Sequence, residues 1–292
     1  MNQGLKIVVL AKQVPDTRNV GKDAMKEDGT INRAVLPAIF NPEDLNALEQ
    51  ALWLKDAVPG STVQIVTMGP PRAADIIRES MFRGADGGVL VTDRKFAGAD
   101  TLATSYTLAA AIRKINPDVI VAGRQAIDGD TAQVGPQVAE KMSIPQVTYC
   151  EQILKVEGTE LTIKRRLEHG TETVTCSMPM VVTVNGSAPE CRPRNARLVM
   201  KYKHAKTTTE LQDLNEDYYM NLRTERCYLN IPEWGVSNLD VEVQELGLSG
   251  SPTKVKKIDN IVFAAKESKR LTASDTDISA LMQELISSHT IG

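Results

Sequence analysis

The chain has 292 residues, of which 42% are hydrophobic and 24% charged, and its formal net charge is -3 at pH 7. This length suits one large domain or one domain with an appendage. The nearly balanced charges do not indicate the basic surface that nucleic-acid binders need. No apolar run approaches the roughly 20 residues that cross a bilayer, and the first residues lack the layout of a signal peptide. We therefore expect a cytoplasmic protein with no transmembrane segment and no nucleic-acid partner.

The first 150 residues alternate between apolar strands and amphipathic helices. Residues 5–11 form a nearly continuous apolar run, which is typical of a parallel strand buried on both faces. Asn41 and Pro42 then mark a helix start, with proline at the first helical position, and this helix should end near Val58. The other expected strands are 63–68, 88–91, 119–122 and 146–149, and the other expected helices are 73–83, 101–115 and about 131–142. Five strands separated by helices predict an α/β fold with a doubly wound, mostly parallel, Rossmann-like sheet.

Beyond residue 150 the apolar residues no longer recur at helical spacing but at every second position. Short strands are expected at 153–156, 160–166, 171–176 and 180–184. We interpret them as an added antiparallel section, residues 151–186, that closes on the domain. Residues 1–200 are therefore expected to form the nucleotide-binding domain.

Residues 201–292 are expected to form a C-terminal arm, because this stretch is polar and offers little core. Near its end, an apolar stripe at helical spacing predicts an amphipathic helix that begins at Ser274 and Asp275. The stripe consists of Ile278, Leu281, Met282, Leu285 and Ile286. Such a helix either folds back on its own domain or docks on a partner subunit, and the pattern leaves both possibilities open.

The candidate ligand site lies where the order of the strands reverses. With the strand order 3-2-1-4-5, this crevice lies beyond the first and fourth strands, where residues 11–16 and 123–136 converge. The second segment combines glycines, small residues and a threonine just before a helix. Its backbone N–H groups and the helix N-terminus therefore predict a phosphate cradle, with an ordinary strand-to-helix turn as the alternative.

Charged residues in the two segments receive separate roles. Lys12 and Arg124 are expected to place positive charge near a ligand phosphate or ring. Asp128 and Asp130 are assigned to turn and capping roles, because a carboxylate beside a phosphate is repelled unless it points elsewhere. Asp130 and Gln133 have the spacing of a capping box, although Pro136 equally permits a helix that begins just after Gly135.

Other signatures of chemistry are missing from the sequence. It contains neither a G-x-G-x-x-G after the first strand nor a P-loop, its four cysteines form no C-x-x-C pair, and its three histidines lie in no nucleophile motif. We therefore expect no catalytic side chain and no metal site, and we assign any chemistry to a bound cofactor.

Several segments together resemble the beta subunits of electron-transferring flavoproteins, over nearly the whole chain. They are VVLAKQVPD (8–16), NPED (41–44), VTMGPP (66–71), the run 123–136 and the stretch 167–184. This resemblance implies a heterodimer with an alpha subunit, which carries an FAD and which the C-terminal arm wraps. It also implies an adenine nucleotide in the crevice.

Three segments are similar to the electron-bifurcating and Fix-type members of that family, namely 96–104, 128–136 and 247–253. Ordinary members hold AMP in the crevice as a structural plug, whereas bifurcating and Fix-type members hold a second FAD there. Val134, where ordinary members usually have threonine, and the bare Gly129 leave room for the larger ligand. The resemblance therefore implies FAD in the crevice.

The resemblance also implies the electron partners. NAD(H) would exchange a hydride pair with the crevice FAD, and the electrons would be divided between ferredoxin or flavodoxin and an acyl-CoA-dehydrogenase-like or quinone-reducing partner. Two alternatives stay open. One is an ordinary beta subunit with structural AMP, and the other is a stand-alone adenylate-binding stress or regulatory module on a similar sheet.

The cofactor-binding residues expected on this basis lie at the strand ends and in the loops after them. They are Ala11, Lys12, Asn41, Thr67, Gly69, Asp100, Thr101, Thr104, Gly123, Arg124, Gln125, Ala126, Asp128, Gly129, Asp130, Thr131, Ala132, Gln133 and Val134. The first amides of helix 101–115 and the Thr101 hydroxyl are expected to reach the flavin end. One loop departs from the ordinary members: Ala196 falls near a leucine that anchors the dehydrogenase in those members, so Leu198 is the expected substitute.

Overall fold

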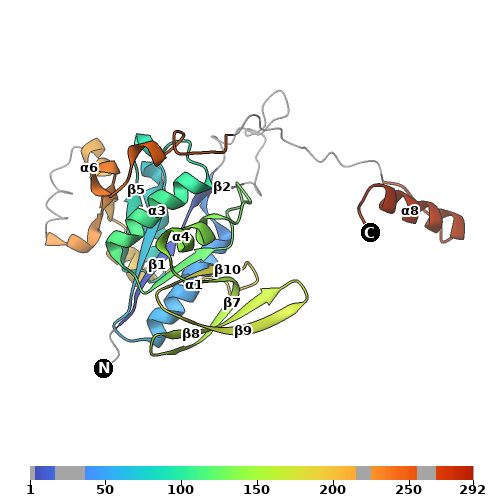
Figure 1. Ribbon diagram of the computed structural model, residues 1–292, viewed down its shortest axis with the longest axis horizontal. Coiled ribbons are helices and arrows are strands. Elements are labelled where there is room, and N and C mark those ends of the chain that lie inside the picture. Colours follow the sequence, from blue (N-terminus) through green and yellow to red (C-terminus); the bar gives the residue numbers. More distant parts are fainter. Residues whose placement is uncertain (1–3, 17–36, 215–224, 255–267, 292) are drawn as a thin grey trace.

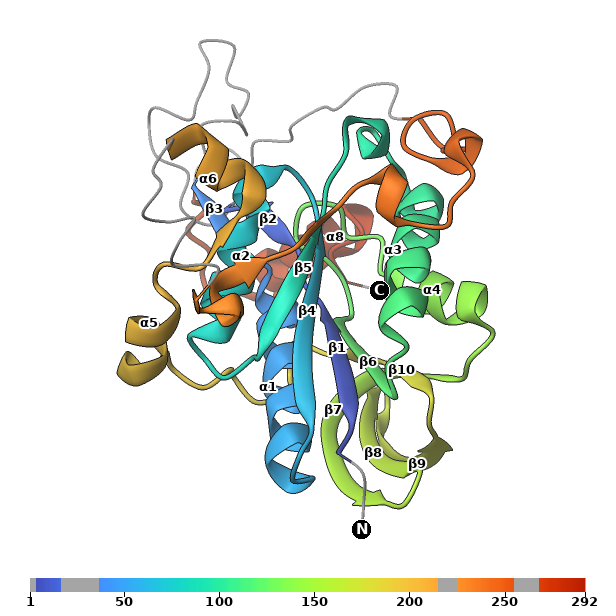
Figure 2. The ribbon, with the colours of Figure 1, turned by 90° about the vertical axis from the view of Figure 1, so that its left-hand side faces the viewer.

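The computed structural model describes residues 4–16, 37–214, 225–254 and 268–291. Its centre is a sheet with the strand order β13-β5-β4-β1-β6-β10-β7-β8-β9. β1 (Lys6–Leu10) lies between β4 (Thr62–Met68) and β6 (Val119–Gly123), and all three are parallel (Figure 2). β5 (Gly87–Val91) extends the sheet beside β4. The predicted order of the first four strands, 3-2-1-4, is therefore confirmed.

Helices cover both faces of this sheet, as Figure 2 shows. α1 (Pro42–Ala57) and α2 (Ala74–Met81) pack on one face, and α3 (Thr101–Ile115) and α4 (Val134–Met142) pack on the other. The side chains of β1 alternate between these two cores, which explains its continuous apolar run. The doubly wound α/β class predicted from the sequence is confirmed.

The end of the parallel sheet differs from the prediction at β10 (Met180–Val184). We expected this segment to be antiparallel, but it pairs in parallel with β6 on one side and with β7 (Gln146–Glu157) on the other. All five of its residues are buried. This is the pattern of a strand covered on both faces, whereas an antiparallel strand with one solvent-exposed face would alternate between buried and exposed residues. β10 thus separates the predicted fourth and fifth strands.

The antiparallel section consists of β7, β8 (Glu160–Leu167) and β9 (Gly170–Ser177). β7 fuses two predicted strands, 146–149 and 153–156, into a single long one. Its first part belongs to the parallel sheet and the rest pairs with β8. β2 (Gln13–Pro15) and β3 (Ala38–Phe40) form a separate two-stranded antiparallel sheet.

The described part of the chain after residue 200 contributes to the same core, so the expectation that this stretch offers little core is wrong. β13 (Glu233–Trp234) adds to the sheet beside β5, and Leu229, Ile231 and Leu246 are buried in the two apolar clusters. The apolar residues of this stretch lie in short or irregular elements, so they show no helix or strand periodicity in the sequence. The short elements here are α5 (Ala196–Tyr202), β11 (Lys206–Thr207), α6 (Thr208–Leu214), β12 (Asn230–Ile231), and 3-10 turns at Cys227–Leu229, Val236–Asn238 and Val243–Glu245.

The predicted C-terminal helix is present as α8 (Asp275–Ser287) with Ser274 as its N-cap. None of its residues is buried, and it stands apart from the domain in Figure 1. Folding back on its own domain is therefore not what the described residues show, and docking on a partner remains a prediction. Residues 255–267, which belong to the expected arm, lie outside the described residues. Among the helices described here, none has the length and apolar character needed to span a membrane.

Candidate nucleotide-binding site

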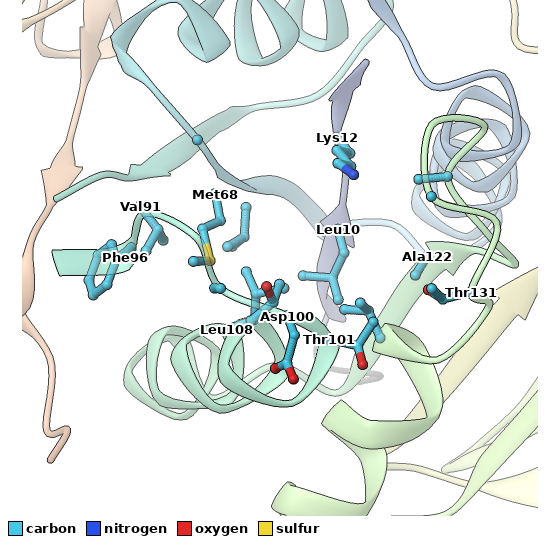
Figure 3. A pocket seen from close by; sticks show the side chains of 18 of the residues that line it. Leu10, Lys12, Met68, Val91, Phe96, Asp100, Thr101, Leu108, Ala122 and Thr131 are labelled. Carbon is cyan, nitrogen blue, oxygen red and sulfur yellow. The ribbon is translucent and has the colours of Figure 1, made fainter. Parts of the chain in front are cut away.

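A large cavity opens at the carboxyl ends of β5, β4, β1 and β6 (Figure 3). Its volume is about 1010 Å³, at the upper end of the range for small-molecule sites. It straddles β1 and β6, the point from which successive strands are added in opposite directions. This is the crevice position that the predicted strand order required.

Polar side chains at the start of α1 hold the loop that follows β6. Asn41 donates from Nδ2 to the carbonyl of Gln125 (2.9 Å) and accepts at Oδ1 from the amide of Ile127 (3.1 Å). Glu43 accepts from the amide of Gln125 (2.9 Å). Asn41 occupies the N-cap position as predicted, but its side chain caps no amide of α1. Its role is to shape the neighbouring loop.

The carboxylate of Asp44 joins the ends of β1 and β6 beside the cavity. It accepts hydrogen bonds from the amides of Lys12 (2.8 Å) and Gly123 (3.1 Å). A side chain at position 123 would collide with this carboxylate, so the close approach requires glycine. Burial raises the pKa of Asp44 to about 7, although both amide hydrogen bonds act in the opposite direction.

The amides of residues 131–135 form the part of the loop that is open to a ligand. Earlier in the loop, the amides of Arg124, Gln125, Gly129 and Asp130 donate to carbonyl or carboxylate groups of the protein. Those of 131–135 have no acceptor within the described part of the chain, and the last of them belong to the first turn of α4. The positive end of the helix dipole adds to their attraction for an anion.

Asp130 does not cap α4, so the predicted capping box is wrong. The helix begins at Val134 with Gln133 as its N-cap. Asp130 has a left-handed φ of 49° and accepts from Nε2 of Gln125 (3.1 Å). A second left-handed residue, Ala132 (φ 53°), follows. The chain therefore completes a turn before helical geometry starts.

The two cationic side chains predicted for the site line the cavity, and each already has an acidic partner. Lys12 Nζ lies 2.7 Å from Oδ1 of Asp128, and Arg124 Nη2 lies 3.1 Å from Oε1 of Glu43. Asp128 thus turns to a lysine and not to the amides that are open to an anion. Both cations remain close enough to the cavity to share their charge with a bound phosphate.

The start of α3 differs from the prediction that its first amides face a ligand. Asp100 is the N-cap, and its carboxylate accepts from the amides of Leu102 (3.0 Å) and Ala103 (3.1 Å). The Thr101 hydroxyl is also engaged, because it donates to Oε1 of Gln133 (2.8 Å) across the cavity. This end of the cavity therefore offers a capped helix and not a second anion site.

Apolar side chains surround the end of the cavity that lies beyond β4 and β5. Met68, Val91, Phe96 and Leu108 gather there, as Figure 3 shows. The charged lining residues nearest to this face are Asp93, Arg94 and Asp100. A flat aromatic ring system is the kind of group that such a surface accommodates.

Most of the predicted site residues line the cavity. They are Ala11, Lys12, Gly69, Asp100, Thr101, Thr104, Gly123, Arg124, Gln125, Ala126, Gly129, Thr131, Ala132, Gln133 and Val134. The predicted residues that do not line it are Asn41, Thr67, Asp128 and Asp130. Thr67 does not line the cavity because side chains alternate between the two faces of a strand, and its neighbours Val66 and Met68 are the ones that line it.

Sequence reasoning missed several residues of the cavity wall. The apolar ones alternate at strand ends, as Val66 and Met68 do, and this pattern could have shown that they share a face. Asp44 lies in the NPED segment, but its buried position between two strand ends is a long-range property. Thr253 comes from the far C-terminal part of the chain, and no local signal marks it as a wall residue.

A doubly wound sheet with free amides at a helix N-terminus beside its switch point is the arrangement of nucleotide-binding α/β proteins. The comparison with protein families agrees and is more specific. Residues 28–211 match the family described as "Electron transfer flavoprotein domain". The chain belongs to the electron transfer flavoprotein family.

Relatives of known name place the chain among the beta subunits. It is 44% identical over 257 residues to "Electron transfer flavoprotein subunit beta" of Clostridium acetobutylicum, with 87% of each chain covered. It is 40% identical over 254 residues to "Caffeyl-CoA reductase-Etf complex subunit CarD" of Acetobacterium woodii, with 86% of each covered. It is 38% identical over 280 residues to "Protein FixA" of Azorhizobium caulinodans, covering 93% of this chain and 90% of that protein. The predicted family is confirmed, and a role in electron transfer with it.

The loop that departs from ordinary members leads into α5. Leu198 packs against the main core cluster, whereas Ala196 is exposed. An anchor for a partner has to be exposed, whereas the side chain of Leu198 already packs against the core of this chain. Leu198 is therefore a poor substitute for the anchoring leucine. The large apolar side chain that α5 does expose is Met200, at 64%.

Proposed function

We propose that this chain is the beta subunit of an electron-bifurcating electron transfer flavoprotein and that its cavity holds a complete FAD. The observation that carries this proposal is the extent of the cavity. It continues from the open amides of residues 131–135, past β1, to the apolar surface around Met68 and Phe96. A mononucleotide would occupy the first end and leave the apolar end exposed to water.

The residues of the cavity divide between the two halves of such a ligand. The amides of 131–135 and the N-terminus of α4 would hold the diphosphate, with charge from Lys12 and Arg124. The apolar end would exclude water from the ring. A bound FAD supplies the redox chemistry, since it accepts two electrons as a hydride and passes electrons on singly. No side chain of this chain need act as an acid or base.

The wider electron route follows from the proposal. NAD(H) would be the two-electron partner, and ferredoxin or flavodoxin and an acyl-CoA-dehydrogenase-like or quinone-reducing protein would receive single electrons. A second FAD would lie on the alpha subunit of the heterodimer. The relatives named as a subunit of a caffeyl-CoA reductase-Etf complex and as FixA support this choice.

The second candidate function is that of an ordinary electron shuttle with AMP in the cavity. The relative from Clostridium acetobutylicum is named only as a beta subunit, and this name is compatible with an ordinary shuttle as well as with a bifurcating protein. A stand-alone adenylate-binding module finds no support in these relatives, which are all subunits of electron-transfer complexes or FixA proteins.

Flavin counting separates the two candidates. The chain is co-expressed with its alpha subunit, the heterodimer is purified, and its nucleotides are released and identified. Two FAD per heterodimer support the proposal, whereas one FAD and one AMP establish the ordinary shuttle and overturn it.

A pair of glycine variants tests whether the FAD lies in this cavity. Gly129 lines the cavity and Gly87 does not, and a Cβ at either position meets no atom within 4 Å. Gly129→Val should lower the flavin content of the beta subunit, because the side chain enters the ligand space. Gly87→Val should leave it unchanged. Equal flavin content in both variants would place the FAD elsewhere.

A further inference from the structure

The C-terminal segment 246–253 reaches the cavity at its last residue, whereas the other lining residues come from residues 10–135. Thr253 is the residue that reaches the cavity. At the other end of the segment, Leu246 is buried in the apolar cluster that α3 covers. Between them the amide of Leu248 donates to the carbonyl of Ala97 (3.1 Å). The segment is thus held along its length against the loop that precedes α3.

The fit between these two loops is close enough to restrict side chains. Gly247 has a left-handed φ of 51°, and a Cβ there would collide with the carbonyl of Lys95. Gly98 faces Leu248 and is also left-handed, with φ 75°. Glycine at 247 lets the two backbones approach, and glycine at 98 leaves room for the side chain of Leu248.

Asp100 fastens the end of this segment. One carboxylate oxygen, Oδ1, caps α3, and the other, Oδ2, accepts from the hydroxyl (2.6 Å) and the amide (3.0 Å) of Thr253. The amide of Asp100 donates to Oγ of Ser251 (2.9 Å), and that hydroxyl donates to the carbonyl of Gly247 (2.6 Å). Partial burial acts to raise the pKa of Asp100, but hydrogen bonds from Thr253 and the α3 amides outweigh it and lower this pKa. The carboxylate is therefore charged and fully engaged.

The geometry points to Asp100 as a positioning residue that couples retention of the cavity ligand to the anchoring of the C-terminal segment. Thr253 is the part of the segment that lines the cavity wall, and its two hydrogen bonds to Asp100 hold it there. A ligand that fills the cavity contacts this wall and binds the fastened state more tightly than the released one. By linkage, the ligand then stabilises the fastened state to the same extent.

This inference rests on the proposed FAD, and matched variants of the heterodimer test it. Asp100→Asn keeps a good N-cap for α3 but turns an amide donor toward the donors of Thr253. Thr253→Val removes the hydroxyl, and Thr253→Ser retains it. FAD should dissociate about tenfold faster from Asp100→Asn and Thr253→Val, as expected for loss of a hydrogen bond to a charged group. Thr253→Ser should behave as the wild type.

Hydrogen exchange provides a readout that a purely structural role would not change. In the wild type, added FAD should slow exchange of the amides in segment 246–253. In Asp100→Asn this effect should disappear, while FAD still protects the amides of 131–135. Wild-type FAD retention in both Asp100→Asn and Thr253→Val, or equal protection of the segment in all variants, would overturn the coupling.

The same variants distinguish failure of the coupling from failure of the proposed function. If the purified wild type contains AMP and not FAD, the proposed function fails, and retention of AMP becomes the measured quantity. Faster AMP release from Asp100→Asn and Thr253→Val then still supports the coupling. Unchanged AMP release overturns it.

Discussion

The ammonium group of Lys12 lies 2.7 Å from one carboxylate oxygen of Asp128 and 2.9 Å from the other. This ion pair joins the loop after β1 to the loop after β6 at the edge of the cavity. Both side chains reach solvent, at 49% and 22% exposure, and exposed pairs of this kind contribute about 0–1 kcal/mol to stability. The pair therefore matters more for the charge presented to a ligand than for the fold.

Replacing Lys12 should affect the ligand far more than the fold. We expect Lys12→Ala to change the melting temperature little and to weaken binding of the cavity nucleotide about tenfold, because one charge-assisted contact is lost. Asp128→Asn serves as the control, since it releases the lysine and should leave binding unchanged or stronger. Nucleotide retention after gel filtration and thermal unfolding measure both effects. Equal loss of nucleotide in the two variants would show that the pair acts by shaping the loops.

Asp44 should make stability depend on pH in the direction opposite to an ordinary acidic group. Its pKa is raised from 3.8 to about 7 in the folded chain, so between these values the folded state binds a proton that the unfolded state releases. This contribution is present at low pH and is lost as the pH rises through 7. The free energy of unfolding of the wild type should therefore fall relative to that of Asp44→Asn from roughly pH 4 to pH 7. Urea unfolding at several pH values measures it, and a constant difference would contradict the shift.

Gly135 should be required by the packing of α4 on β10. A Cβ at this position would lie 2.5 Å from Cγ2 of Thr183, and overpacking of this kind costs about 1–3 kcal/mol. We expect Gly135→Ala to lower the free energy of unfolding by that amount. Thr183→Ser removes the opposing methyl group, so the double variant should recover most of the loss. Denaturant unfolding of the four proteins tests this, and failure of the double variant to recover would place the conflict elsewhere.

The exposed apolar stripe of α8 should matter for assembly and not for the stability of the chain itself. Leu281 and Ile286 are 38% and 55% exposed, and no residue of the helix is buried. We expect Leu281→Asp to weaken association with the alpha subunit while the beta chain unfolds at an unchanged temperature. Gln283→Asp, which adds the same charge beside the stripe, should associate normally. Gel filtration of the co-expressed subunits distinguishes these outcomes, and normal association of Leu281→Asp would remove this helix from the interface.

Elements with strong local signals were predicted closely. The helix Thr101–Ile115 has the bounds that were expected, because Asp100 is a good N-cap and the apolar period that follows is clear. The strand Met180–Val184 was located correctly but given the wrong direction. Its apolar run identifies a buried strand, but a run of residues contains no information about which neighbours the strand will have.

In the candidate site, too, local features were predicted and long-range contacts were not. The segment after β6 was recognised from its glycines and threonine, and most of its residues line the cavity. Asp130 was expected to cap the helix, but left-handed geometry at Ala132 delays its start, and Gln133 occupies the N-cap position without a side-chain capping bond. The contact between Asp100 and Thr253 spans 153 residues, and no spacing rule connects positions so far apart.

What the sequence by itself determined is local: which segments form strands and helices, and where a turn of glycines and small residues can open its amides to an anion. These properties depend on neighbours within a few residues. Only the tertiary structure decided that Asp44 joins two strand ends, that β10 enters the parallel sheet and that Thr253 lines the cavity. Each of these three features depends on contacts between segments far apart in the sequence. Such contacts form when the apolar side chains of all these segments are buried together in one core.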